Sequence, residues 1–226
     1  MKLRPLSRSE FRGIDRRAID RFGIAGVVLM ENAGREAARW LVELGIDGPV
    51  AICCGKGNNG GDGFVMARHL EAWGYAVRVL LVADPAELQG DALINYQILR
   101  ASSTPVTRWS VGKVDSEALE VLRNAAWIVD GLLGTGMQGE VREPIRSVIE
   151  TMNSCPAPKF AIDIPSGLDA DTGLLLGLAV RATHTATFVS MKIGFARPDS
   201  ALYTGVVRAF DIGLPIRLLR EFSEDP

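Results

Sequence analysis

A glycine-rich run that directly follows an apolar stretch constrains the fold more than any other part of this chain. The apolar stretch is Val50 to Cys54, and the run GKGNNGGDG, at residues 55–63, contains five glycines, two amides and one carboxylate. Glycine permits positive φ angles and lets backbone N–H groups approach an anion or a sugar, and the N-terminus of a following helix adds partial positive charge. We therefore expect a strand, a ligand-binding turn and then a helix from about Asp62 to Trp73. Such runs can also serve only to reverse the chain, so the match to G-x-G-x-x-G carries little by itself.

Apolar runs and helical segments alternate along the chain after two helices at its beginning. Ser7 and Glu10 form a capping box for a first helix that Gly23 ends, and a second helix is predicted from Ala25 to Glu43. The runs that read as strands are nearly all apolar, and they are Val50–Cys54, Ala76–Val82, Trp127–Asp130, Phe160–Ile164, Thr185–Val189 and Val206–Ile212. Further helices are expected near residues 62–74, 90–101, 115–124 and 142–153. This pattern is typical of an α/β domain with a mostly parallel sheet covered on both faces, and we expect one domain over residues 1–226.

The composition of the chain limits the classes of binding partner and the cellular compartment that we expect. The net charge is −2, the pI is about 5.8 and the basic residues are scattered, so a nucleic-acid partner is not expected. The three cysteines are an odd number and two of them, Cys53 and Cys54, are adjacent, which argues against a disulfide framework and favours the cytoplasm. The N-terminus lacks the apolar core of a secretion signal, and no stretch approaches 18 apolar residues. We expect neither secretion nor a membrane span.

Four polar segments each begin where a predicted strand ends. They are residues 55–63, 130–140, 163–169 and 190–194. The carboxyl ends of parallel strands share one edge of the sheet, and open α/β sheets bind ligands in the crevice outside that edge. Segments that are distant in the sequence can therefore line one pocket.

Two of these segments place a carboxylate at the end of a strand. In DGLLGTG, Asp130 precedes a loop whose N–H groups and Thr135 hydroxyl could hold a phosphate or a ribose, although an ordinary glycine-rich loop would look the same. In DIPSGLD, the proline and glycine fix an abrupt turn, so Asp163 and Ser166 can point into the crevice or can merely cap the turn.

Oxygen ligands dominate the candidates for a metal site. Asn59, Asp130 and Ser166 offer oxygen atoms, which suit a hard cation of low charge, or they simply hydrogen-bond between loops. His69 and His184 fall outside the motifs and are expected to be structural. The chain has no zinc-ligand spacing, no nucleophile elbow and no Walker A ending, so these sequences disfavour zinc, serine-hydrolase and phosphoryl-transfer chemistry.

Five motifs between Met30 and Pro215 together resemble the NAD(P)H-hydrate epimerase family, the YjeF N-terminal domain type. They are MENAGREAA, GKGNNGGDGFVMARHL, DGLLGTGMQGEVREPI, AIDIPSGLDADTG and FDIGLP. The resemblance implies a Rossmann-like three-layer α/β/α sandwich, a homodimer, the substrates NADHX and NADPHX, and one K⁺ ion per subunit held by Asn59, Asp130 and Ser166. It also implies that substrate contacts come from the residues Asn58, Asn59, Gly60, Gly61, Asp62, Gly134, Thr135, Gly136, Met137, Gln138, Gly139, Glu140 and Asp163.

The resemblance implies epimerisation of the R and S forms at C6 of the hydrated nicotinamide ring, as a repair of damaged cofactor. This reaction needs an acid and a base near the C6 oxygen, and Asp163 is the candidate catalytic residue. Lys192 would assist the proton transfer or hold a phosphate. The chain departs from the family here, because VSMKIGF replaces a commoner wording such as APKPG, and a solvated surface lysine is the alternative. No fused dehydratase domain is expected, so a separate NAD(P)HX dehydratase would take the product.

Two other functions remain open at this point. An NAD(P)-dependent oxidoreductase would use Gly55, Gly57 and Gly60 for the pyrophosphate and Asp84 for the ribose, but no catalytic Tyr-Lys or His partner is evident. A non-catalytic nucleotide-binding or scaffold protein of the same fold would be expected to lose pocket residues, which are present in this chain.

Overall fold

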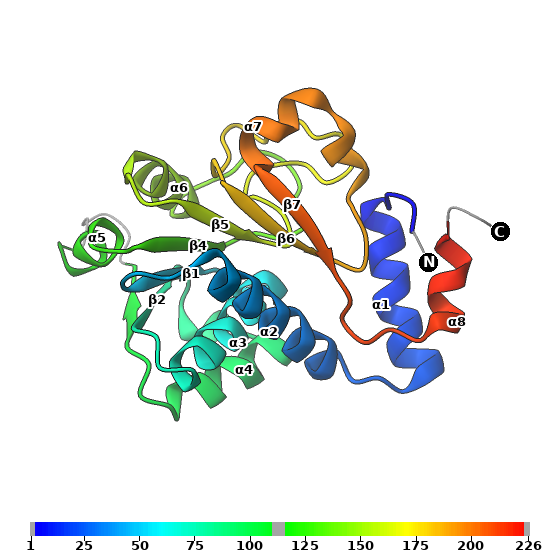
Figure 1. Ribbon diagram of the computed structural model, residues 1–226, viewed down its shortest axis with the longest axis horizontal. Coiled ribbons are helices and arrows are strands. Elements are labelled where there is room, and N and C mark those ends of the chain that lie inside the picture. The colour runs from blue at the N-terminus through cyan, green and yellow to red at the C-terminus, as the bar shows by residue number, and fades with distance from the viewer. Residues whose placement is uncertain (1–2, 110–115, 224–226) are drawn as a thin grey trace.

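The computed structural model describes residues 3–109 and 116–223, and a sheet of seven parallel strands runs through its centre (Figure 1). The order across the sheet is β3-β2-β1-β4-β5-β6-β7, and every neighbouring pair is parallel. The chain therefore builds outward from β1 in one direction and then from β4 in the other, which creates a crevice beyond their carboxyl ends. The strands are β1 Val50–Cys54, β2 Val77–Leu81, β3 Val106–Arg108, β4 Trp127–Gly131, β5 Lys159–Ile162, β6 His184–Phe188 and β7 Val206–Phe210.

Helices cover both faces of this sheet and give the expected three layers. In Figure 1, α2, α3 and α4 lie below the sheet, α5 and α6 lie at its other face, and α1 and α8 stand together at one side. The bounds are α1 Arg8–Phe22, α2 Gly26–Leu44, α3 Asn58–Ala72, α4 Gly90–Arg100, α5 Ser116–Arg123, α6 Ile145–Ser154, α7 Ala201–Thr204 and α8 Ile216–Leu219. The predicted α/β/α sandwich with two helices before the first strand is confirmed.

The first strand shows why its sequence is apolar without alternation. Ile52 and Cys54 belong to the hydrophobic cluster shared with α1 to α4, whereas Ala51 and Cys53 belong to the cluster shared with α5 and α6. Successive side chains of a strand point to opposite faces, and here both faces are covered. All five residues of β1 are buried, so an apolar side chain is favoured at each position.

Three features differ from the sequence predictions. The strand β3 was missed, because it has only three residues at the edge of the sheet and follows Pro105. The short helices α7 and α8 were also missed. The helix α3 begins at Asn58 and not at Asp62, so the first amides of the glycine-rich run are helical. Glycine is a poor helix former by roughly 1 kcal/mol per residue, which is why the sequence pattern placed the start too late.

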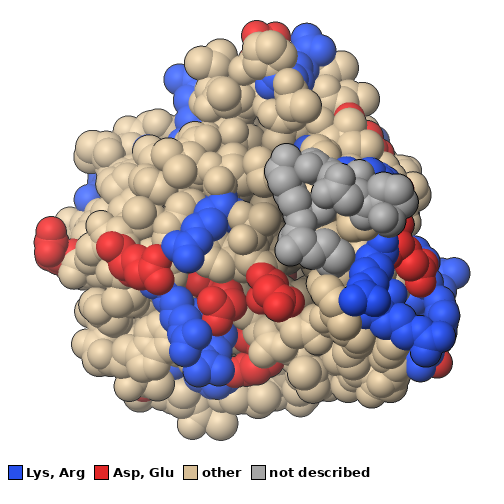
Figure 2. Space-filling model, turned by 45° about the vertical axis from the view of Figure 1, so that its right-hand side comes forward, with Lys and Arg blue, Asp and Glu red and all other residues tan. Residues whose placement is uncertain are grey.

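The capping box predicted at Ser7 and Glu10 is present. The Ser7 hydroxyl accepts a hydrogen bond from the Glu10 N–H, and the Glu10 carboxylate accepts one from the Ser7 N–H at 2.9 Å. Basic and acidic side chains lie next to one another at several places on the face shown in Figure 2. None of the helices in the described part of the chain has both the length and the apolar character needed to cross a membrane.

Candidate functional site

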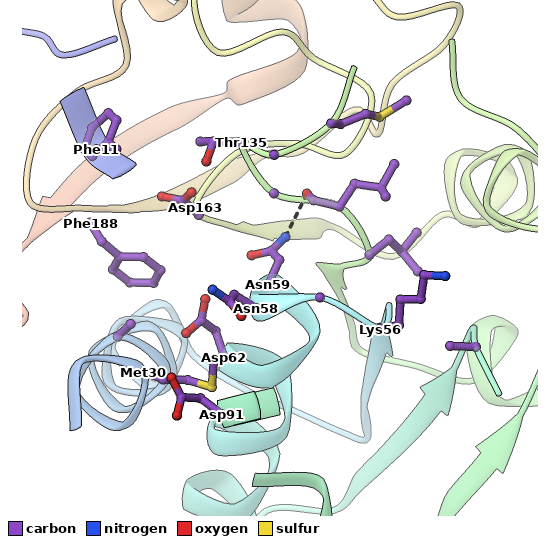
Figure 3. A pocket seen from close by; sticks show the side chains of 18 of the residues that line it. Phe11, Met30, Lys56, Asn58, Asn59, Asp62, Asp91, Thr135, Asp163 and Phe188 are labelled. Carbon is purple, nitrogen blue, oxygen red and sulfur yellow. Dashed lines mark hydrogen bonds between the residues drawn. The ribbon is translucent and has the colours of Figure 1, made fainter. Parts of the chain in front are cut away.

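A cavity of about 970 Å³ opens at the carboxyl edge of the sheet, where the polar segments meet. Residues that follow β1, β4, β5 and β6 line it, and α1 and α2 contribute to its wall. Figure 3 shows Thr135 and Asp163 on one side of the cavity and Asn58 and Asp62 on the other, with Phe188 between them. The segments predicted to converge therefore do so.

The glycines after β1 serve close packing of the backbone. None of the five has a positive φ, contrary to the conformational freedom that the sequence suggested. A Cβ on Gly60 would overlap the carbonyl oxygen of Gly55, and one on Gly61 would lie 2.5 Å from the sulfur of Met30. Gly60 and Gly61 are buried and do not line the cavity, and their contact with the substrate stays a prediction. Their small size lets α3 approach β1 and α2, which carries Asn58, Asn59 and Asp62 to the cavity wall.

Asp62 is the carboxylate that the first turn of α3 presents to the cavity. Its side chain is almost buried, and no hydrogen-bond partner for it occurs within the described residues. Burial raises the pKa of Asp62 well above its ordinary value, and the nearby charges of Asp163 and Asp15 raise it further, while Lys192 opposes the shift. These surroundings favour the neutral form of the carboxyl, which can donate a hydrogen bond or a proton.

Asp163 and Lys192 form an ion pair at the floor of the cavity. Lys192 is 1% exposed, and its Nζ also donates to the Thr187 hydroxyl at 2.7 Å and lies 4.0 Å from the centre of the Phe11 ring. The alternative that Lys192 is a solvated surface lysine is therefore wrong. The side chain of Asp163 is 18% exposed, so the pair is covered on the protein side and open on the cavity side.

The backbone around this pair is strained. Asp163 has φ 66° and Val189 has φ 66°, and they are the two non-glycine residues with positive φ within the described chain. Each follows a strand directly, after β5 and β6, and each lines the cavity. Such conformations cost of order 1–3 kcal/mol and cluster at functional sites.

Asn59, which lines the cavity, is connected to Asp130 and Ser166 through hydrogen bonds to the Leu133 backbone. Asp130 is 0% exposed and accepts hydrogen bonds from the Ser166 hydroxyl at 2.6 Å, the Ser166 N–H at 2.7 Å and the Leu132 N–H at 3.2 Å. Burial raises the pKa of Asp130 to about 6, and these hydrogen bonds oppose the shift. Asn59 donates to the Leu133 carbonyl at 2.9 Å (Figure 3), which leaves its own carbonyl oxygen buried without a partner.

This orphaned oxygen decides how well the three residues fit a cation. A buried acceptor without a donor costs free energy, and a hard monovalent cation would satisfy it together with oxygen atoms of the neighbouring loops. No group of three or more His, Cys, Asp or Glu residues that could hold a metal occurs among residues 3–109 and 116–223. One carboxylate with neutral oxygens suits an ion of single charge better than a divalent one.

Only some of the residues predicted to contact the substrate from the loop after β4 line the cavity. The residues from Gly134 to Gln138, including Thr135, Gly136 and Met137, line the cavity, whereas Gly139 and Glu140 do not. The Glu140 side chain is exposed and lies over Gly177, where an added Cβ would be 3.8 Å from the Glu140 Cβ. The structure thus places the last two predicted contacts away from the site.

The first helix contributes residues that sequence reasoning missed. Phe11, Arg12, Asp15 and Ile19 of α1 line the cavity. Burial among the cavity walls raises the pKa of Asp15 to about 6, with a further contribution from the charge of Asp163, although water in the cavity reaches its carboxylate. The spacing i, i+3, i+7 of Arg12, Asp15 and Ile19 was the available signal, because it marks a second stripe beside the buried face of α1.

Asp84, the candidate ribose ligand of an oxidoreductase, is engaged by protein donors. It accepts from the Ala86 N–H at 2.9 Å and from Arg108 at 2.8 Å, and these bonds lower its pKa. A Cβ on Gly55 would overlap the carbonyl oxygen of Leu132, so this glycine is required for packing against the loop after β4. The geometry does not favour the oxidoreductase interpretation.

Known proteins resemble this chain in sequence and in fold. An NAD(P)H-hydrate epimerase of Rhodopirellula baltica is 44% identical over 99% of this chain and 90% of its own length. A bifunctional NAD(P)H-hydrate repair enzyme of Salinibacter ruber is 41% identical over 98% of this chain and 43% of its own length. The crystal structure of the yeast protein ynu0 matches with a TM-score of 0.83 and 23% identity, covering 99% of this chain and 95% of that one. The family described as YjeF-related protein N-terminus matches residues 26–194, and the chain belongs to this family.

Proposed function

We propose that this chain is an NAD(P)H-hydrate epimerase, which interconverts the R and S forms of hydrated NADH and NADPH at C6 of the nicotinamide ring. The observation that carries the conclusion is the Asp163–Lys192 ion pair, which is enclosed by protein on one side and faces a cavity of about 970 Å³ on the other. The name of the Rhodopirellula baltica relative, which is of similar length, points to the same activity.

The chemistry of epimerisation is proton transfer around one carbon atom. When a base removes the proton of the C6 hydroxyl, the C6–N1 bond breaks with its electron pair on nitrogen, and the nitrogen then accepts a proton. The open aldehyde closes on its other face by the reverse steps. Loss of the hydroxyl as water and return of water to the opposite face reaches the same product. Both routes require one group that removes a proton and one that supplies a proton.

Two carboxyl groups of the cavity are suited to these two tasks. The carboxylate of Asp163 is held by Lys192 and faces the cavity, so it is the proton acceptor. The raised pKa of Asp62 favours the protonated form of its carboxyl, so Asp62 is the proton donor. Different environments separate the roles of two similar groups. Lys192 orients Asp163. Its positive charge offsets the negative charge of the carboxylate when Asp163 releases the proton again.

A potassium ion is part of the proposal. Asn59, Asp130 and Ser166 would hold it, and the support is the partnerless buried oxygen of Asn59. The Asn59 amide and the Ser166 hydroxyl, which also donates to the wholly buried Asp130, share the Leu133 carbonyl as acceptor. When bound, the ion would offset the negative charge of Asp130 and fix the position of the loop that begins at Leu133.

The setting of the enzyme follows from the same reasoning. All three cysteines, Cys53, Cys54 and Cys155, are free and buried, which supports a reducing compartment such as the cytoplasm. A bifunctional repair enzyme among the relatives supports coupling to an NAD(P)HX dehydratase. We also propose a homodimer, on the resemblance to the family alone, and light scattering at several concentrations tests it.

The direct test is turnover of the pure epimer. The purified chain is incubated with R-NADHX, and separately with R-NADPHX, in potassium buffer, and the R to S ratio is followed by chromatography beside an enzyme-free control. Acceleration above the spontaneous rate supports the epimerase. A folded chain that accelerates neither substrate would reject it and favour a nucleotide-binding or scaffold role.

A further inference from the structure

The positively charged side chains of the cavity wall differ in what they already bind. Four such side chains line the cavity in the described part of the chain, and three of them are paired with carboxylates. Lys56 pairs with Glu87, and the other two pairs are Arg108 with Asp84 and Lys192 with Asp163.

Arg12 is the fourth cation, and it has no carboxylate partner and no hydrogen bond among residues 3–109 and 116–223. Asp15 lies one turn further along α1 and faces the same cavity without forming an ion pair with Arg12. The guanidinium of Arg12 is therefore available to an anionic ligand.

The guanidinium lies beside the loop that follows β4. A Cβ on Gly136 would be 3.8 Å from a terminal nitrogen of Arg12, so the arginine approaches this glycine directly. The backbone N–H groups of Gly134, Thr135 and Gly136 find no acceptor within the described residues, although all three residues line the cavity. Successive free N–H groups in a loop form a cradle for an anion, and an arginine adds charge and a forked pair of donors.

We propose that Arg12, together with the N–H groups of residues 134–136, binds the diphosphate of the dinucleotide substrate. The proposal rests on the proposed function for the identity of the ligand, because hydrated NADH and NADPH both carry a diphosphate. The other cavity cations are already neutralised by carboxylates, so the substrate's negative charge is matched at Arg12. The helix α1 lies before residues 26–194, which are the part that matches the family, and it would thus complete the substrate site from outside that part.

The test measures binding separately from turnover. ADP-ribose, which carries the diphosphate, and adenosine, which does not, are titrated by calorimetry into the wild-type chain and into the Arg12→Ala and Arg16→Ala variants. Arg16 is on the same helix but does not line the cavity, so its variant is a matched control for the loss of one charge. We expect Arg12→Ala to weaken ADP-ribose binding by roughly 10- to 100-fold, since hydrogen bonds to charged groups are the strong ones. Arg16→Ala should change it less than about threefold, as expected for an exposed charge.

Two further measurements make the outcome specific. The salt dependence of ADP-ribose binding should become shallower in Arg12→Ala, because one phosphate contact is lost, and adenosine binding should not change. Equal ADP-ribose affinity in wild type and Arg12→Ala would overturn the inference, and so would an equal loss in Arg16→Ala. A chain that binds ADP-ribose through Arg12 but does not epimerise NADHX would support the inference while the proposed reaction fails. An active epimerase whose KM for NADHX is unchanged by Arg12→Ala would overturn the inference alone.

Discussion

Asp130 near the end of β4 and Asp163 directly after β5 lie at the same edge of the sheet, yet the structure gives the two carboxylates opposite surroundings. Asp130 is wholly buried and accepts three hydrogen bonds from Ser166 and Leu132. Asp163 is bound by Lys192 and is open to the cavity. The difference teaches that the partners of a carboxylate, more than its depth, indicate its role. Hydrogen bonds from backbone N–H groups and a serine hold loops in place. A lysine beside a cavity instead stabilises a carboxylate that can accept and release a proton.

The strongest way to break this comparison is Asp163→Asn. Asparagine tolerates positive φ, so the backbone at φ 66° should remain, while the side chain can no longer accept a proton. We expect turnover of R-NADHX to fall by about 10²- to 10⁴-fold, the usual contribution of a positioned acid or base. Initial rates from chromatography give the loss, and thermal unfolding checks that the variant is folded.

A matched substitution separates chemistry from the loss of a charge. Asp169 also carries an ion pair at this end of the sheet, to Arg8 at 2.5 Å, but it does not line the cavity. Asp169→Asn should therefore leave turnover near normal. If folded Asp163→Asn protein turned over at a rate close to that of the wild type, Asp163 would not be the proton acceptor.

The second test removes the buried carboxylate of Asp130. Asp130→Ala leaves the Ser166 N–H and hydroxyl and the Leu132 N–H without their acceptor, so we expect a loss of about 2–4 kcal/mol in the free energy of unfolding. Urea unfolding measures it, in KCl and in choline chloride at equal ionic strength. The wild-type chain should be stabilised by potassium and the variant should not.

The control for this test is a carboxylate that accepts a backbone hydrogen bond on the surface. Asp211 accepts from the Gly213 N–H at 2.8 Å and is exposed, so Asp211→Ala should cost little and should keep the response to potassium. If potassium stabilised Asp130→Ala as much as the wild type, the ion would bind elsewhere.

A smaller effect is expected at Asp62, because its raised pKa favours the neutral form of the carboxyl. An asparagine side chain at this position would mimic the shape and a hydrogen-bond donor of that neutral carboxyl but could not supply a proton. Asp62→Asn should thus lower kcat by roughly tenfold to a hundredfold with little change in KM. Steady-state kinetics at neutral pH measure both constants. An increase in KM with an unchanged kcat would instead assign Asp62 to substrate binding alone.

Sequence reasoning located the site because its residues follow strand ends. Asn59, Asp130, Ser166 and Asp163 come together at one edge as the parallel sheet requires. The packing role of the glycines could not be predicted from the sequence. The overlap of a Cβ at Gly60 with the Gly55 carbonyl depends on how α3 packs.

The contribution of α1 could not be foreseen for a related reason. The capping box and the buried face of α1 can be predicted from the local sequence. The local sequence does not predict that the stripe with Arg12 and Asp15 borders the cavity. That contact depends on the packing of α1 at the side of the sheet, between segments far apart in the chain. Site residues that come from a terminal helix can therefore be identified only from the structure.

The smallest effect concerns another carboxyl of the cavity wall, that of Asp15, which lies near Asp62, Asp163 and Lys192 and has Arg12 one turn away. Its pKa rises from 3.8 to about 6 on folding, so between these values the folded chain binds a proton that the unfolded chain releases. The stabilisation from this proton is complete below about pH 4 and is lost as the pH rises through about 6.

Asp15→Asn should therefore stabilise the fold at about pH 8, by about 1 kcal/mol or less because cavity water screens the charge, and the gain should fade toward about pH 4.5. Urea unfolding at these two pH values and at about pH 6 measures it. Asp20→Asn, on the same helix but outside the cavity wall, is the control for a charge near the end of α1. A gain that is equal at all three pH values, or equal in the control, would mean that folding does not raise the pKa of Asp15. A gain confined to high pH would show that the fold disfavours the charged form of this carboxyl, chiefly because it is partly enclosed by the cavity walls. Asp15 would then be a carboxyl that the cavity keeps at a cost to the stability of the fold.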